Sequence, residues 1–189
     1  MQRTVDYFEE PGPRNTPRCL EIVKRAVDDG GLAHVVVATT TGDTGADAAE
    51  ALSETGANIV AVTHSAGFKK PSELELTEKN RRRILEAGGK IYTGTILTHS
   101  LETSLAMQFQ GVSPTMLVAL TLRRLGQGIK VVCEITMEAC DAGLVPEGEE
   151  VLAVAGTGRG ADTVAIMRSA ASKRFLELKV LEILAKPRE

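Results

Sequence analysis

The sequence has no excess of positive charge and little aromatic surface. Its 22 Lys and Arg against 25 Asp and Glu give a formal net charge of −3, and it contains no Trp, two Tyr and four Phe. Nucleic-acid-binding domains are usually basic, so this balance argues against a nucleic-acid partner. The densest basic run is Arg81, Arg82 and Arg83, and the acidic residues near it predict a solvated helix face rather than a binding patch.

Cysteine is scarce as well, and long apolar runs are missing. Cys19, Cys133 and Cys140 are an odd number without C-x-x-C spacing, so neither a disulfide framework nor a metal site is predicted. No apolar run approaches the roughly 18 residues of a membrane-spanning helix. The N-terminal segment MQRTVDYFEE has no apolar core of the kind that a signal peptide needs. We therefore expect a cytoplasmic protein without a membrane partner.

Short β-branched apolar runs alternate with amphipathic segments along the chain. Helices are expected at 16–30, from Asp43 to Gly56 and at 75–87. The predicted strands are 34–39, 58–63, 90–93, 151–156 and 163–168. This alternation predicts an α/β fold with a parallel sheet and helices on both faces, and the length of 189 residues predicts one domain. Because a short loop, GTGRGAD, joins the last two strands, we expect these two to pair antiparallel.

Cap chemistry suggests where two helices begin. Thr16 is expected to be the N-cap of the first helix, with Pro17 at its first helical position, and Asp43 can cap the second.

The segment after 93 is harder to assign. Residues 97–128 look helical, with a helix start at Ser113. For 132–142 the β-branched content favours a strand, whereas the spacing of the apolar residues favours a helix, which we prefer. The tail from 173 onward has apolar residues but no clear period.

Two Gly/Thr-rich loops follow predicted strands, in VVVATTTGDTGADA (35–48) and VLAVAGTGRGADT (151–163). Glycine lets backbone N–H groups approach a phosphate, threonine hydroxyls donate hydrogen bonds, and a helix N-terminus adds partial positive charge. Residues 40–45 fit this chemistry, and Arg159 in the second loop supplies a cation. Because the carboxyl ends of parallel strands share one edge of a sheet, the two loops predict one phosphate-binding site.

Asp43 complicates this interpretation, because a carboxylate repels a phosphate. Either Asp43 caps the helix while residues 40–42 hold the phosphate, or it accepts hydrogen bonds from ligand hydroxyls. The Walker pattern is absent, and GTGRGAD misses the Rossmann spacing. Plain turn and cap chemistry therefore remains the alternative explanation for both loops.

The residues of these loops carry a resemblance. TTTGDTGADAAEAL with GANIVAVTHS, and EEVLAVAGTGRGADTVAIMR, resemble the C-terminal domain of pyruvate kinase, where the two loops hold the phosphates of a sugar bisphosphate effector. The resemblance implies no phosphoryl transfer to ADP, because the catalytic barrel of the kinase is absent from this sequence.

A closer resemblance covers the whole chain. VDYFEEPGPRNT, TTTGDTGADA, HSAGF, EITMEACDAG and GTGRGADT resemble an archaeal family of stand-alone pyruvate kinase C-terminal-domain-like proteins. It implies a three-layer αβα domain over residues 1–189, with a mixed five-stranded sheet, an antiparallel last strand and a helical insertion at about 95–128. It also implies FMN as the ligand.

FMN gives the candidate binding residues specific roles. The phosphate is expected on the loop 40–44, the ribityl hydroxyls at Asp43, Asp162 or Thr163, and the flavin ring at Phe68 or the loop 156–160. For Phe68, as for Tyr7 and Phe8, we prefer a role in core or loop packing over stacking on the flavin. The candidate cofactor-binding residues are Thr40, Thr41, Gly42, Asp43, Thr44, Gly67, Phe68, Gly156, Thr157, Gly158, Arg159, Gly160, Asp162 and Thr163.

No catalytic residue can be assigned from the sequence. On a helix, Glu134, Glu138 and Asp141 share a face that points either at the ligand or at solvent. His64 and His99 follow strand or loop ends, where a general base can lie, but we expect them to be hydrogen-bonded structural residues. Cys140 has no base beside it and is not expected to be a nucleophile.

Two functions therefore remain open. The first is an FMN-binding protein. The second is a regulatory or sensor domain that binds a phosphorylated metabolite, such as a sugar phosphate, without catalysis. A phosphate-ester hydrolase ranks below both, because no metal or nucleophile motif is present. Small domains of this kind often form dimers, so a homo-oligomer is also expected.

Overall fold

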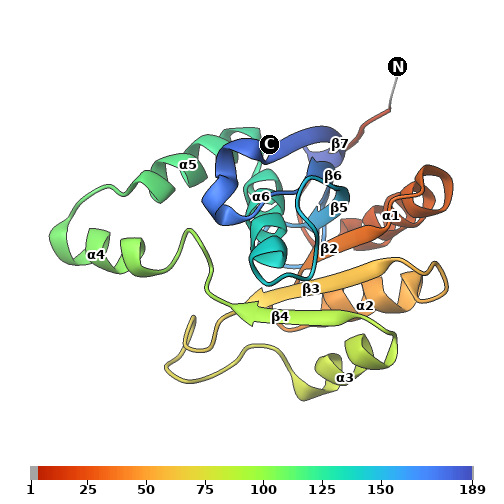
Figure 1. Ribbon diagram of the computed structural model, residues 1–189, viewed down its shortest axis with the longest axis horizontal. Coiled ribbons are helices and arrows are strands. Elements are labelled where there is room, and N and C mark those ends of the chain that lie inside the picture. Colours follow the sequence, from red (N-terminus) through yellow and green to blue (C-terminus); the bar gives the residue numbers. More distant parts are fainter. Residues whose placement is uncertain (1–3, 189) are drawn as a thin grey trace.

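One sheet runs through the protein, and its middle strands are the apolar runs of the sequence. The computed structural model describes residues 4–188. Within this range, seven strands lie in the order β1-β7-β6-β5-β2-β3-β4 (Figure 1). They are β1 (Asp6–Phe8), β2 (His34–Ala38), β3 (Asn58–His64), β4 (Lys90–Gly94), β5 (Glu150–Ala155), β6 (Thr163–Arg168) and β7 (Lys179–Pro187).

The sheet is mixed, as expected, but it has more strands than expected. β6 runs antiparallel to both β5 and β7, and the other neighbouring pairs are parallel. The predicted number of five strands is wrong, because β1 and β7 extend the sheet beyond β6. β1 has three residues, and Lys179, Glu182 and Lys186 interrupt the apolar pattern of β7. The antiparallel strand is therefore β6, and it is not the last strand of the chain.

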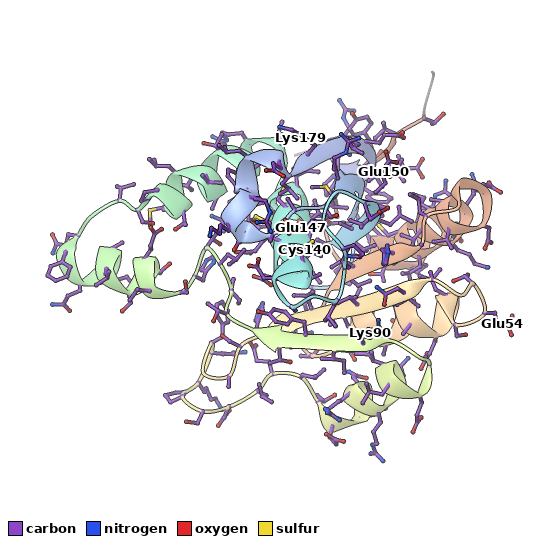
Figure 2. All side chains as sticks on the ribbon, viewed as in Figure 1. Glu54, Lys90, Cys140, Glu147, Glu150 and Lys179 are labelled. Carbon is purple, nitrogen blue, oxygen red and sulfur yellow. The ribbon has the colours of Figure 1, made fainter. Side chains whose placement is uncertain are left out.

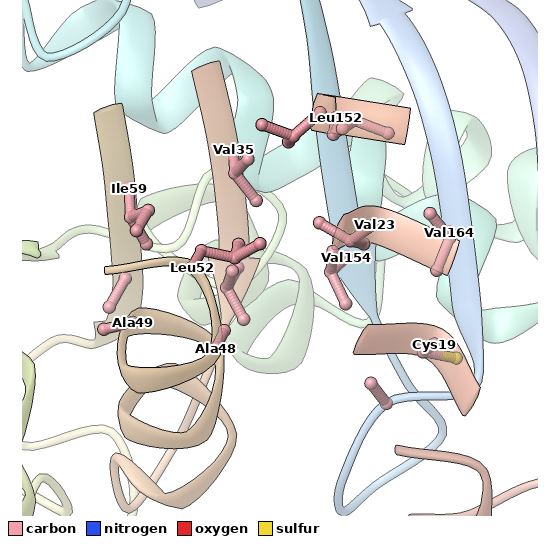
Figure 3. Close-up of a cluster of buried hydrophobic side chains, with 14 of the residues drawn as sticks. Cys19, Val23, Val35, Ala48, Ala49, Leu52, Ile59, Leu152, Val154 and Val164 are labelled. Atoms are coloured by element: carbon pink, nitrogen blue, oxygen red, sulfur yellow. The ribbon is translucent and has the colours of Figure 1, made fainter. Parts of the chain in front are cut away.

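Helices cover both faces of the sheet and give the expected three layers. Side chains of α1, α2 and α3 pack with Val35 and Val37 on one face, and α6 packs with Val36 on the other. Figure 3 shows Val35 with Val23 of α1 and Leu52 of α2 in the first of these clusters. Alternate residues of a strand point to opposite faces, so the valine run 35–37 serves both layers. The four helices are α1 (Thr16–Gly30), α2 (Asp43–Leu52), α3 (Glu78–Glu86) and α6 (Gln127–Asp141).

Both cap assignments made from the sequence are wrong. Asn15 is the N-cap of α1, and Thr16 lies inside the helix, where its hydroxyl accepts a hydrogen bond from Ala161 N at 2.8 Å. Gly42 is the N-cap of α2, and Asp43 is the first helical residue and makes no capping bond. In each case, tertiary partners far along the chain engage the side chain that local rules assign to the helix end.

The segment between β4 and α6 forms an arm that extends away from the sheet (Figure 1). It consists of α4 (Leu101–Phe109), α5 (Pro114–Leu122) and a 3₁₀ turn (Arg123–Leu125). The predicted start at Ser113 is confirmed, because its hydroxyl accepts from Met116 N at 3.2 Å. Two further 3₁₀ turns lie at Pro13–Asn15 and Ser172–Glu177.

Helix α6 confirms the helical interpretation of 132–142. Among the described residues, no single helix is long and apolar enough to span a membrane; α4 and the segment to Leu125 reach that length only as a pair bent by 106°.

Candidate functional site

A cleft of about 1030 Å³ opens at the carboxyl ends of β2, β3 and β5. From β2 the chain continues to β3 on one side, whereas β5 lies on the other side of β2. The loops that follow β2 and β5 therefore diverge at this point. Such a divergence leaves a crevice, and open α/β sheets bind their ligands there. The sequence predicted a binding site at the carboxyl ends of the strands, and the structure has a cleft at this edge of the sheet.

The first wall of the cleft is the threonine loop, residues 39–44. Gly42 has φ +96°, and a Cβ atom on it would lie 2.6 Å from Asn80 Cβ, so a side chain is excluded. Asn80 of α3 is buried and donates from Nδ2 to Asp43 Oδ1 at 2.7 Å and to the carbonyl oxygen of Thr41 at 3.0 Å. The hydroxyl of Thr41 donates to Asp43 Oδ2 at 2.6 Å. A side chain from a different helix therefore fixes the shape of the loop.

These bonds keep Asp43 ionised. The hydrogen bonds from Thr41 and Asn80 lower the pKa of the Asp43 carboxyl, and the charges of Arg159 and Arg83 act in the same direction. Because Asp43 does not cap α2, the first backbone N–H groups of the helix keep no intrahelical acceptor. Within residues 4–188, no side-chain hydrogen bond engages Thr40 or Thr44. These donors remain available to a ligand.

The second wall is the arginine loop, residues 156–160, which follows β5, the neighbour of β2. A Cβ atom on Gly156 would collide with the carbonyl oxygen of Gly160, and Gly160 (φ +69°) packs against Pro13. The tight packing of the loop thus accounts for both glycines. Arg159 is exposed at its tip and lines the cleft.

Asp162 and Thr163 lie outside the cleft, contrary to their expected role on the ribityl chain. Asp162 is fully buried and accepts from Gly12 N at 2.9 Å and Thr157 N at 3.0 Å. The hydroxyl of Thr163 donates to Asp162 Oδ1 at 2.9 Å. The Asp162 carboxylate therefore ties the arginine loop to the N-terminal segment and is occupied by protein donors.

The structure brings most of the candidate residues together. Those that line the cleft are Thr40, Thr41, Asp43, Thr44, Phe68, Gly156, Gly158, Arg159 and Gly160. Those that do not are Gly42, Gly67, Thr157, Asp162 and Thr163. Gly42 packs on α3, and Gly67 donates its N–H to the carbonyl oxygen of Glu73 at 2.9 Å. The Thr157 hydroxyl is buried, with no hydrogen-bond partner in the described part of the chain.

The floor of the cleft is one face of α6, with Lys130, Glu134 and Glu138. All three are buried, and Lys130 and Glu134 form an ion pair. The Thr98 N–H and hydroxyl donate to Glu134 Oε1 at 2.8 and 2.6 Å, and Leu97 N–H donates to Glu138 Oε1 at 3.2 Å. The shared face of Glu134 and Glu138 was expected, whereas Lys130 was missed because its neighbours in sequence are apolar.

Asp141 does not join this face. It is exposed and accepts a hydrogen bond from Ser172 N at 2.9 Å.

The pKa values of the two buried glutamates are shifted in opposite directions from the ordinary value of a glutamate. Burial raises the pKa of both carboxyls, but at Glu134 the charge of Lys130 and the hydrogen bonds from Lys130 and Thr98 outweigh it and lower the pKa. At Glu138, burial and the charge of Glu134 raise the pKa to about 8. The floor therefore combines an ionised pair with a carboxyl that holds a proton near neutral pH.

Two histidines and one phenylalanine line the cleft at its rim. His64 Nδ1 lies 2.9 Å from Glu75 Oε2, and the ring of Phe68 lies 4.3 Å from that of His64 and 6.0 Å from that of His99. Burial and the charge of Lys130 lower the pKa of His99, which keeps its imidazole neutral. A general base and a structural partner both remain open roles for these histidines.

The structure also gives the positions of the cysteines and of the potential metal ligands. All three cysteines are free and buried. Cys140 lies on α6 near Glu147 (Figure 2), where burial and the charges of Glu147 and Asp141 raise its pKa to about 11 against the opposing hydrogen bond of Ser169. Among residues 4–188, no group of three His, Cys, Asp or Glu side chains is placed to hold a metal ion.

Comparison with known proteins places the chain in context. Residues 18–168 match the model of the pyruvate kinase alpha/beta domain family. A crystal structure of pyruvate kinase from Cryptosporidium parvum is 19% identical with a TM-score of 0.41, covering 85% of this chain and 24% of that chain. Cryptosporidium parvum pyruvate kinase in complex with ADP is also 19% identical with a TM-score of 0.41, covering 85% of this chain and 25% of that chain.

O-ureido-L-serine synthase is 18% identical with a TM-score of 0.33, covering 72% of this chain and 42% of that chain. The chain spans about a quarter of the length of the pyruvate kinase chains. The family match runs from α1 to the end of β6, so it includes both walls and the floor of the cleft, and leaves out β1 and β7.

Proposed function

This chain belongs to the pyruvate kinase alpha/beta domain family, and from that premise we propose that its cleft binds FMN, with the phosphate on the threonine loop. The observation that carries the proposal is that the threonine loop and the arginine loop, which follow the neighbouring strands β2 and β5, line the same cleft. The activity of a complete pyruvate kinase is not part of the proposal, because the chain spans only about a quarter of those proteins.

The phosphate subsite that we propose consists of Thr40, Thr44 and the first turn of α2. The free N–H groups of this turn carry the positive end of the helix dipole. Arg159 supplies a full charge from the other wall, and an arginine can bond two phosphate oxygens at once. The Asp43 carboxylate is turned toward Thr41 and Asn80 by their hydrogen bonds, so we place the phosphate on the Thr40 and Thr44 side of the loop.

The rest of the cleft suits a flat ring system. Its volume of about 1030 Å³ is at the upper end of the range for small-molecule sites, which is roughly 300–1,000 Å³. Apolar side chains from β2, β3, α6 and the segment after β4 also line the cleft, and Phe68 offers one aromatic face. These apolar residues are Ala38, Val62, Ile96, Val131 and Ile135. When bound, FMN would supply a ring that accepts and donates electrons.

The absorption spectrum of the freshly purified protein tests this proposal. We expect a yellow protein that releases FMN on denaturation, or a colourless one that becomes yellow and retains FMN through gel filtration. Retention of riboflavin but not of FMN would contradict the phosphate subsite, since the two compounds differ only by the phosphate group.

A second function, that of a sensor for a phosphorylated metabolite such as a sugar phosphate, is favoured by the polar floor. Lys130, Glu134 and Glu138 can bond the hydroxyl groups of a sugar, and Phe68 is the one aromatic residue among the described lining residues. A ligand that binds only the folded state raises the midpoint of thermal unfolding. Stabilisation by sugar phosphates without stabilisation by FMN would select this function over the first.

For the partner, we propose a second copy of the chain that docks on the arm. The arm exposes apolar side chains on all sides, and α4 buries none of its residues. A nine-residue helix is not stable by itself in water, so α4 needs a partner surface. The exposed side chains are Leu101, Leu105, Met107, Phe109, Val112, Leu117, Leu120 and Leu125.

The exposed side chains of the arm support this choice. A standard interface buries about 800 Å² on each partner, so it needs a continuous set of exposed side chains such as the arm presents. A two-fold axis pairs like surfaces, so two arms cover each other without a further component.

We also propose a branch of the family and a cellular compartment for this protein. The motifs VDYFEEPGPRNT and EITMEACDAG support the archaeal stand-alone branch of the family. The three free thiols support a reducing compartment such as the cytoplasm.

A further inference from the structure

We infer that the floor of the cleft is a proton-transfer site, in which the buried Glu138 passes a proton to a carbonyl oxygen or ring nitrogen of the bound ligand. The ligand takes up the matching positive charge with the proton, and the ammonium group of Lys130 lies on the same face of α6 as the carboxylate that remains. The inference rests on the proposed function, because a phosphate on the threonine loop leaves the other end of the ligand to reach the floor. The ligand class is a phosphorylated compound with a conjugated carbonyl group or a heteroaromatic ring.

The helix places these three groups in one row. Lys130, Glu134 and Glu138 are spaced at four-residue intervals, so they lie on the same face of α6, and all three line the cleft. Their exposed fractions are 3%, 5% and 3%. A long charged side chain is rarely buried this deeply unless it has a partner.

Among the described residues, Glu138 has no cationic side chain as an ion-pair partner, because Lys130 is already paired with Glu134. Lys130 is paired with Glu134, whose Oε1 also accepts both hydrogen bonds of Thr98. No ion pair involving Glu138 exists within residues 4–188. An isolated carboxylate is strongly disfavoured in a buried site, and it takes up a proton instead.

The surroundings of Glu138 add no compensating charge. The ionisable groups that act on it from α6 are Glu134, Lys130 and Asp141, and Tyr92 faces it from β4. Two of these four are carboxylates and one is a phenol, so Lys130 is the single cation among them. The raised pKa of Glu138, about 8, agrees with this balance.

The hydrogen bonds show which oxygen carries the proton. Leu97 N–H donates to Glu138 Oε1, so Oε1 is the acceptor oxygen and the proton belongs on Oε2. In the described part of the chain, Oε2 has no hydrogen-bond partner. Because Glu138 lines the cleft, this O–H group is free to donate to a ligand.

The transfer needs no further reactant. The O–H bond of Glu138 breaks, its electron pair stays on the carboxylate, and a new O–H or N–H bond forms on the ligand. The ammonium group of Lys130 then faces two carboxylates instead of one. The reverse step returns the proton to Glu138 when the ligand leaves.

Infrared spectroscopy of the ligand-free protein tests the protonation of Glu138. The wild type should show the carbonyl band of a protonated carboxyl at neutral pH, and the band should disappear as the pH rises through about 8. In Glu138→Gln the band should be missing, and in Glu147→Gln, which changes a carboxylate beside Arg174, it should remain. A band that persists in Glu138→Gln, or that disappears at the ordinary pKa of glutamate, about 4.3, would overturn the inference.

Calorimetry with FMN as the probe tests whether the ligand binds the protonated form of Glu138, as the transfer requires. Titrations near pH 8 in two buffers of different ionisation heat give the number of protons exchanged on binding. Near pH 8 part of the free wild type has lost the Glu138 proton, so we expect a fractional proton uptake on binding in the wild type, and this uptake should be lost in Glu138→Gln. Equal exchange in both proteins would overturn the inference. If FMN does not bind at all, the proposed FMN function fails, and the infrared titration still decides the state of Glu138.

Discussion

Asn80 of α3 donates a hydrogen bond to Oδ1 of Asp43 at 2.7 Å and thereby fixes the loop that forms one wall of the cleft. The same Nδ2 group donates to the carbonyl oxygen of Thr41, and the backbone N–H of Asn80 donates to the hydroxyl of Thr77, which is the N-cap of α3. One buried amide therefore joins two helices and the proposed phosphate subsite. The geometry of that subsite depends on a residue which does not touch the ligand.

Replacement of Asn80 by Ala should lower both stability and affinity. Removal of the amide leaves Asp43 Oδ1 and Thr41 O without this donor, and the loss of such a buried partner costs about 1–3 kcal/mol of unfolding free energy. Urea denaturation measures this change, and FMN titration should show weaker binding because the loop loses its anchor. Lys79→Ala, on an exposed neighbour in α3, should stay within about 0.5 kcal/mol of wild type. Equal stability of the two variants would contradict this role of Asn80.

Replacement of Arg159 by Ala should weaken binding without a loss of stability. The side chain is exposed at the tip of the arginine loop, so its removal leaves no cavity. A charge-assisted bond to a phosphate contributes about 1.5–3 kcal/mol, which corresponds to a roughly 10- to 150-fold higher Kd for FMN. Arg168→Ala, an exposed arginine at the far end of β6, is the matched control. An unchanged Kd in Arg159→Ala would remove this loop from the site.

The glycines of the arginine loop should differ in their tolerance of alanine. At Gly160 a Cβ atom would collide with Pro13, and φ is +69°, so Gly160→Ala should cost at least about 2 kcal/mol. Gly158 also has positive φ, but a Cβ atom there meets open space, so Gly158→Ala should cost about 1–2 kcal/mol, from backbone strain alone. Chemical denaturation of both variants checks the order, and a less stable Gly158→Ala would contradict it.

The arm should control the oligomeric state. Leu105 on α4 and Leu85 on α3 have nearly equal exposed fractions, 47% and 45%. Leu105→Asp should therefore convert a dimer into a monomer, whereas Leu85→Asp should leave the dimer intact. Light scattering after gel filtration measures both masses. A monomeric wild type, or a wild type that instead sediments with phospholipid vesicles, would contradict a second copy as the occupant.

Stability should depend on pH through Glu138. Its pKa is raised from 4.5 to about 8 in the folded protein. Between these values the folded state keeps a proton that the unfolded state has released, so the unfolding free energy falls as the pH rises. This group contributes a slope of up to about 1.4 kcal/mol per pH unit. In Glu138→Gln, urea unfolding over the same range should show a correspondingly flatter profile; an identical slope would contradict the raised pKa.

Local patterns predicted the centre of the fold well. The valine run 35–37 is a buried strand because it serves both faces of the sheet, and the short loop GTGRGAD joins an antiparallel pair as expected. The helix at 132–142 was identified from its apolar spacing. These features follow from interactions between residues that are close in sequence, so the sequence contains the signal for them.

Other features depend on partners that are distant in sequence. Asp43 bonds Asn80 instead of capping α2, and Thr16 bonds Ala161 instead of capping α1. Lys130 is buried beside Glu134 although no local pattern marks it as a site residue. β7 was not recognised as a strand because charged residues alternate irregularly with its apolar ones. Tertiary contacts decide each of these cases, and they overrule the local preference.

The most direct test of the phosphate subsite is an FMN titration of wild type and of the double variant Thr40→Val, Thr44→Val. The control is Thr55→Val, which removes a hydroxyl beyond the other end of α2, where it bonds the carbonyl oxygen of Leu52. We predict that wild type and Thr55→Val bind FMN with similar Kd and that the double variant loses binding. Equal affinity in all three proteins, or no binding by wild type, would contradict the account.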